Sequence, residues 1–173
     1  MHRIMGLDIG DRRIGVAVSD PTQTLATPLK TIVRKDDESA VLEITALIKQ
    51  HDIGRLVIGL PYLLDGSLGE QARKVMEFTA KIRGRTAIET VMQDERLTSV
   101  TAGQKLREGG KKRDRLRRQI EAATTHQRLL EARKKRDRLK KQIDVAAATV
   151  ILQAYLDDIA AADQISQQVP PSL

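Results

Sequence analysis

Three extended apolar runs joined by short turns occupy the first part of the chain. Turn-forming residues separate these runs at Gly10-Asp11 and at Asp20-Pro21. Consecutive strands joined by such short turns pair antiparallel, because parallel pairing needs a long crossover connection. The chain is therefore predicted to begin with an antiparallel meander, whose strands are RIMGLDI at 3–9, RIGVAVSD at 13–20 and LATPLKTIV at 25–33.

The apolar spacing after the meander alternates between helical and extended patterns. It predicts helices at 36–51 and 69–83, strands at 55–61 and 86–93, and a largely helical remainder that ends in the apolar segment 144–156. The order is β-β-β-α-β-α-β-α-α, and strands joined through a helix are expected to lie parallel. The result is an α/β protein with a mixed five-stranded sheet flanked by helices, which fits the ribonuclease H-like fold.

The length of 173 residues suits one domain with a full core. We place this domain at 1–160 and expect the tail at 161–173 to be poorly ordered. The chain has no cysteine, which excludes disulfides and thiolate metal sites. No apolar run approaches the length expected of a membrane span, and the N-terminus lacks a signal-peptide pattern. These features predict a cytoplasmic protein with no membrane partner.

The positive charge is concentrated in one segment. Residues 105–141 contain sixteen Lys or Arg and five Asp or Glu, so the remaining residues of this +7 chain are slightly acidic on balance. Such a segment attracts polyanions and binds phosphate backbones in a salt-dependent way, which predicts a nucleic acid partner. The alternative is a solvated arm with no binding role.

The basic segment contains an internal repeat. KKRDRLRRQIEAA at 111–123 is followed by KKRDRLKKQIDVA at 134–146, and eight of the first ten paired positions are identical. Two copies are too few for a solenoid, so we interpret the extra copy as part of a basic helical insertion at about 109–141.

Three carboxylates stand out as candidate site residues. Asp8 lies inside an apolar strand, where a lone charge is costly unless it is paired or binds a cation. Glu95 directly follows the strand at 86–93, and Asp144 opens the apolar final helix. Two of them have simpler interpretations, since Glu95 could be a surface ion-pair partner and Asp144 a helix N-cap.

Three converging carboxylates without His or Cys would form an oxygen-only site. Such a site suits Mg²⁺ or Mn²⁺ and does not suit zinc. One or two of these ions can hydrolyse a phosphodiester by activating water and stabilising negative charge on the phosphate and the leaving oxygen. We therefore expect Mg²⁺ or Mn²⁺ as the cofactor.

Four ordered motifs resemble the YqgF family. They are GLDIGDRRIGVAVSD, VIGLPYLLDGSLGEQA, QDERLTS and DVAAATVILQAYLD, and the resemblance runs from about residue 3 to 158 with an interruption at about 111–133. Members of this family are described as pre-16S rRNA nucleases and Holliday-junction resolvase-like proteins. The resemblance implies a ribonuclease H-like fold and a divalent-metal nuclease that matures the 5′ end of 16S rRNA. It places the catalytic and metal-binding carboxylates at Asp8, Glu95 and Asp144.

Other residues have candidate roles near this site. Arg12, Arg13 and Arg96 could contact phosphate oxygens of a substrate. Asp94 competes with Glu95, because only one of two adjacent side chains can face the site, and the family pattern favours Glu95. Glu121 aligns with Asp144 in the repeat, but the sequence after Glu121 lacks the apolar face of the final helix.

Several functions share these features. The leading prediction is a metal-dependent endonuclease that acts on pre-rRNA, and a Holliday-junction resolvase acting on branched DNA would use the same chemistry. A resolvase would require a homodimer with two sites, whereas an rRNA nuclease could be a monomer. A non-catalytic RNA-binding assembly factor would keep the fold and use the basic segment alone. A sugar-kinase or actin-like ATPase would need a second lobe, which 173 residues cannot supply.

Overall fold

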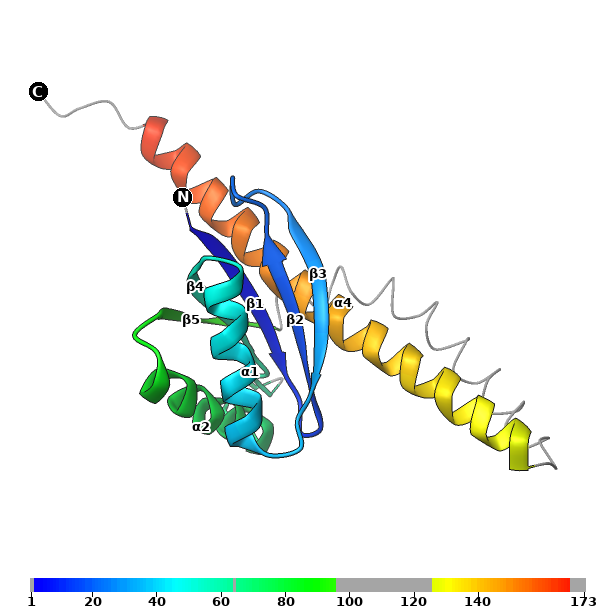
Figure 1. The fold of residues 1–173 in the computed structure, drawn as a ribbon. Helices are drawn as coiled ribbons and strands as arrows, with labels where there is room; N and C mark the ends of the chain where they lie inside the picture. The colour runs from blue at the N-terminus through cyan, green and yellow to red at the C-terminus, as the bar shows by residue number, and fades with distance from the viewer. Residues whose placement is uncertain (1, 64, 96–125, 169–173) are drawn as a thin grey trace, which may run out of the picture.

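The computed structural model describes residues 2–63, 65–95 and 126–168. The meander, both helical crossovers and the fifth strand form where the sequence predicts them (Figure 1). The elements are β1 (Arg3–Ile9), β2 (Arg13–Ser19), β3 (Ala26–Val33), α1 (Asp37–Gln50), β4 (Ile53–Leu60), α2 (Glu70–Arg85), β5 (Glu89–Asp94) and α4 (His126–Gln168).

The five strands form one mixed sheet in the order β3-β2-β1-β4-β5. The pairs β1–β2 and β2–β3 are antiparallel, as expected for strands joined by short turns. The pairs β1–β4 and β4–β5 are parallel, because α1 and α2 carry the chain back across the sheet. This topology is the ribonuclease H-like arrangement predicted from the order of elements.

Helices cover both faces of the sheet. Figure 1 shows α1 and α2 in front of it and α4 behind it. Successive side chains of β1 therefore point to different helices. Met5 and Leu7 belong to the core shared with α1 and α2, whereas Ile4 belongs to the core shared with α4.

Glycines in the sheet let α4 lie very close to it. A Cβ atom added at Gly6 would lie 2.7 Å from the Cβ of Leu152, and one added at Gly15 would collide with the backbone carbonyl of Asp144. These two positions have no room for a side chain, so they fix the height of α4 above β1 and β2.

The final helix differs from the prediction at both ends. We expected it to begin at Asp144, but α4 already begins at His126, and residues 126–141 of the expected insertion are part of it. The predicted poorly ordered tail is wrong for residues 161–168, which continue the helix. Residues 109–125 and 169–173 lie outside the described part of the chain. The helix is longer than predicted because residues of high helix propensity, mainly Lys, Arg, Gln and Ala, continue along it.

The length of α4 also corrects the expectation about membrane spans. The helical segment 133–164 is long and apolar enough to cross a membrane by length and composition alone. Its apolar side packs on the sheet, however, where Ala148, Leu152 and Leu156 are fully buried. A core helix of a globular domain passes the same test, so this is weak evidence for a span.

Candidate active site

Asp8 lies near the end of β1 on the face of the sheet that α4 covers. It follows the alternation set by Ile4 and Gly6, which both face α4. In the sheet register Asp8 is the direct partner of Gly15 in β2, the residue on which the backbone of Asp144 rests. The carboxylate of Asp8 is thus partly buried between the sheet and α4.

Glu95 reaches the same face from the other side of β1. It follows β5 directly, and its backbone N–H donates to the carbonyl oxygen of Leu60 over 3.3 Å. Its side chain lies across Gly59, where an added Cβ would collide with Oε1 of Glu95. The absence of a side chain at position 59 is therefore what lets this carboxylate extend over β4 towards β1.

Asp144 occupies an interior position of α4 above the β1–β2 hairpin. Arg13 Nε donates to Asp144 Oδ2 over 2.5 Å, and the two side chains are 26% and 23% exposed, respectively. The N-cap interpretation of Asp144 is wrong, because α4 begins at His126 and the Asp144 backbone is inside the helix. Its carboxylate instead forms an ion pair with the first residue of β2.

The pKa values of Asp8 and Glu95 respond to the charges of neighbouring carboxylates. Burial, reinforced by the negative charge of Asp144, raises the pKa of Asp8 to about 6. Burial, reinforced by Asp8 and then Asp94, raises the pKa of Glu95 to about 7. Asp8 therefore interacts with both of the other carboxylates and lies at the centre of the group.

The donor chemistry of this group suits a divalent cation, but the ligand geometry is not assembled. All donors are carboxylate oxygens, and their mutual repulsion is what a cation would relieve. In the described ranges no three His, Cys, Asp or Glu side chains are placed to hold one ion together. The ion pair between Arg13 and Asp144 accounts for part of this, since it engages one Asp144 oxygen.

Glu95 and its neighbour Asp94 lie at the end of β5. Asp94 is the last residue of this strand and pairs in the sheet with Leu60. Glu95 follows it, and the pKa of Glu95 is raised by burial, by Asp8 and by Asp94. A simple surface role for Glu95 fits poorly with a carboxylate that is held over Gly59 and largely desolvated.

The remaining predicted residues are distributed differently. Arg12 is exposed in the β1–β2 turn next to Arg13, so its guanidinium faces solvent near the group. Arg96 and Glu121 lie outside the described residues. The site residues in the described ranges thus come from β1, the β1–β2 turn, β2, the end of β5 and α4.

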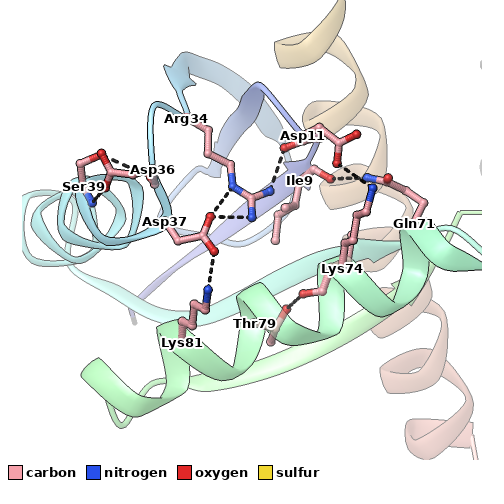
Figure 2. Close-up of polar contacts among 12 residues, drawn as sticks. Ile9, Asp11, Arg34, Asp36, Asp37, Ser39, Gln71, Lys74, Thr79 and Lys81 are labelled. Carbon is pink, nitrogen blue, oxygen red and sulfur yellow. Dashed lines mark hydrogen bonds and ion pairs between the residues drawn. The ribbon is translucent and has the colours of Figure 1, made fainter.

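Sequence reasoning missed a polar network that supports the β1–β2 turn from the opposite face of the sheet (Figure 2). Arg34 donates from Nη1 to the carbonyl oxygen of Gly10 over 3.1 Å and from Nε to Asp37 over 2.8 Å. Its guanidinium also lies 4.4 Å from the ring centre of Phe78.

Two residues of α2 complete this support. Gln71 donates to the carbonyl oxygen of Ile9 over 3.4 Å, and Lys74 lies 3.8 Å from the carboxylate of Asp11. The network joins α1, α2 and the turn that follows Asp8. Apart from the Arg34–Asp37 pair, its contacts join residues that are distant in sequence, so local spacing does not signal the network.

Comparisons with known proteins agree with this architecture. A family model described as RuvX, Holliday junction resolvase, matches residues 2–125. A protein of Chloroflexus aurantiacus named "Putative pre-16S rRNA nuclease" is 36% identical over 169 residues, which cover 98% of this chain and 95% of that protein. A protein of Clostridioides difficile with the same name is 39% identical over 155 residues, which cover 90% of this chain and 94% of that protein.

Solved structures with a similar chain trace include two resolvases. Fowlpox virus resolvase in complex with Holliday junction DNA aligns with a TM-score of 0.47 at 10% identity, over 91% of this chain and 98% of that one. T. thermophilus RuvC in complex with a Holliday junction substrate aligns with a TM-score of 0.46 at 7% identity, over 58% of this chain and 70% of that one.

The family model and the relatives define a nuclease-class hydrolase that acts on phosphodiester bonds. The family match covers well over half of the chain, and the relatives match almost all of it. The chain belongs to the RuvX family, the family that the four YqgF motifs indicate.

Proposed function

We propose that this chain is a divalent-metal-dependent endonuclease that processes the 5′ end of pre-16S rRNA, with Asp8, Glu95 and Asp144 as its metal ligands. The observation that supports the proposal is the electrostatic coupling of these carboxylates on one face of the sheet. Asp144 adds to the raised pKa of Asp8, about 6, and Asp8 adds to the raised pKa of Glu95, about 7. Burial of these charges costs free energy that a bound cation would offset, and the three side chains would have to move closer to one another to hold a single ion.

In this proposal the residues have distinct tasks. Asp8, Glu95 and Asp144 would hold Mg²⁺ or Mn²⁺, which supplies an activated water and stabilises charge on the phosphate. Arg13 forms an ion pair with the Asp144 carboxylate. If Asp144 served as a metal ligand, Arg13 could instead donate to a phosphate oxygen of the substrate, and Arg12 and Arg96 would add further phosphate contacts.

The substrate assignment depends on the relatives. The two similar proteins are named for pre-16S rRNA, whereas the family description names Holliday junctions. The relatives named for pre-rRNA align over nearly the whole chain at 36% and 39% identity, which favours pre-rRNA as the partner. Branched DNA is the alternative substrate, and it would require a homodimer in place of a monomer. We also propose cytoplasmic residence, where pre-rRNA would be available.

The test is cleavage of a pre-16S rRNA 5′ fragment in Mg²⁺ or Mn²⁺ by wild type and by Asp8→Asn. We expect the substitution to lower the cleavage rate by at least about a hundredfold, because it removes the central carboxylate. A control, Asp52→Asn, changes an exposed carboxylate that pairs with His2 away from the site and should cleave normally. Equal cleavage by wild type and Asp8→Asn would refute the proposed site.

Cleavage of a four-way DNA junction is measured in parallel, so that the cleavage rates on the two substrates can be compared. Faster cleavage of the junction than of the pre-rRNA would replace the rRNA assignment by a resolvase. Binding of the RNA without cleavage in either metal would instead favour an assembly factor. That last function is consistent with the unassembled ligand geometry among the described carboxylates.

A further inference from the structure

The first part of α4 extends beyond the sheet as an exposed arm (Figure 1). The helix packs on the sheet from Asp144 onwards, through side chains such as Ala148 and Leu152. Before Asp144, a hydrogen bond joins the carbonyl oxygen of Lys141 to Thr31 Oγ1 over 2.9 Å. In the arm between Glu131 and Lys140, the described side chains are exposed except for Leu139, which is half-buried.

This arm is strongly basic. Its exposed acidic residues are Glu131 and Asp137, and its exposed basic residues are Arg133, Lys134, Lys135, Arg136, Arg138, Lys140 and Lys141. Such a density of positive charge on one helix creates a potential that attracts polyanions. A second copy of the same basic pattern lies at 111–123, outside the described residues.

The helical repeat places some of these basic residues on the side of Asp144, some on the opposite side, and Lys134 and Arg136 on the flanks between them. Because α4 continues without a break, positions three, four and eleven residues before Asp144 share its side of the helix. These positions are Lys141, Lys140 and Arg133, which we call the basic track. Asp137 shares this side and weakens its potential. Lys135 and Arg138 lie on the opposite side of the helix.

We propose that the basic track binds the phosphate backbone of a double-helical part of the substrate that continues from the cleavage position near Asp144. This inference rests on the proposed function, since it takes Asp144 to mark the cleavage position. From Arg133 to Lys141 the track spans about 12 Å at 1.5 Å per residue, which corresponds to about three to four base steps of a double helix.

The composition of the arm favours a duplex over a single strand. No Phe, Tyr or Trp occurs between His126 and Ala154. Single strands are bound largely by stacking of their bases on aromatic rings, whereas duplexes present phosphates at regular spacing. A helix with cations along one side and no aromatic residue is therefore better suited to the regular phosphates of a duplex than to unstacked bases.

The test compares two double variants with the same loss of charge. Arg133→Gln/Lys140→Gln removes two cations of the track, and Lys135→Gln/Arg138→Gln removes one Lys and one Arg from the opposite side. Binding of a hairpin RNA with a stem of pre-16S sequence is measured by fluorescence anisotropy over a range of KCl concentrations, in EDTA. Working without divalent metal separates this test from cleavage.

We expect the track variant to weaken binding at least about tenfold and to lower the slope of log K against log salt by about two, because two phosphate contacts are lost. The opposite-side variant should change affinity by less than about threefold. Thermal melting followed by circular dichroism should be the same for both, since all four side chains are exposed.

Three results would overturn the proposal. Equal losses of RNA affinity in the two variants would mean that net charge alone attracts the RNA. Unchanged affinity in both variants would mean that the arm does not contact it. Equal affinity for an unpaired RNA of the same length would refute the duplex assignment. If the wild type binds as expected but cleaves nothing in Mg²⁺ or Mn²⁺, the basic track stands while the proposed nuclease function fails.

Discussion

Arg34 shows how a single side chain can support a site from the far side of a sheet. Its guanidinium joins the Gly10 carbonyl of the β1–β2 turn, the Asp37 carboxylate of α1 and the Phe78 ring of α2. Only 14% of its side chain is exposed. Hydrogen bonds made by a largely buried charged group stabilise the folded protein more than hydrogen bonds at the surface do.

We expect Arg34→Ala to lower the free energy of unfolding by about 2–4 kcal/mol, because it leaves Asp37 and the Gly10 carbonyl without this donor. Lys81→Ala is the matched control, since Lys81 pairs with the same Asp37 but its side chain is 55% exposed. Its loss should cost less than about 1 kcal/mol. Urea unfolding measures both variants, and equal losses would show that the buried network contributes nothing beyond a surface pair.

At the scale of elements, the contact between α4 and the sheet decides where Asp144 lies. Position 15 in β2 and position 6 in β1 have no room for a side chain under α4. The close approach sets the position of the helix, and the helix carries one of the proposed metal ligands. A single methyl group added at position 15 therefore tests this contact.

We expect Gly15→Ala to destabilise the fold by about 1–3 kcal/mol and to reduce RNA cleavage by more than about tenfold, because α4 must move away from Asp8. Gly84→Ala is the control, since nothing lies within 4 Å of a Cβ added at Gly84 in α2. That variant should be neutral or more stable by up to about 1 kcal/mol. Urea unfolding and the cleavage assay together check the pair, and full activity of Gly15→Ala would contradict this geometry.

At the scale of the whole molecule, the carboxylates make stability depend on pH, and the proposed function adds a dependence on metal. The pKa values of Asp8 and Glu95 in the folded protein, about 6 and about 7, exceed their ordinary values of 3.8 and 4.5. Each group therefore contributes stability that is complete below its ordinary pKa and is lost as pH rises through its folded value. Without metal, the folded protein should lose stability between about pH 4 and about pH 8.

We expect Asp8→Asn to be about 1–3 kcal/mol more stable than wild type near pH 8 in EDTA, because it removes the central buried charge. Addition of Mg²⁺ or Mn²⁺ at that pH should raise the melting temperature of wild type by a few degrees and leave Asp8→Asn unchanged. Thermal melting over a grid of pH and metal concentration measures both effects. Identical responses of the two proteins would contradict a cation site at Asp8.

The sequence predicted the fold of this chain because local rules and global topology agree in it. The alternating apolar residues of β1 and β2, and the helical spacing of α1 and α2, each indicate one element, and short turns or helical crossovers allow one sheet order. The choice of Asp8 also came from local chemistry, since a carboxylate in an apolar strand is costly wherever that strand lies.

Only the tertiary structure decided how the carboxylates are related. Arg13 and Asp144 are distant in sequence yet form an ion pair, and position 15 has no room for a side chain only because α4 crosses β2 there. The beginning of α4 at His126 and the support from Arg34 also escaped prediction. Periodicity records which face of an element is apolar, whereas distances between elements depend on packing that no single segment contains.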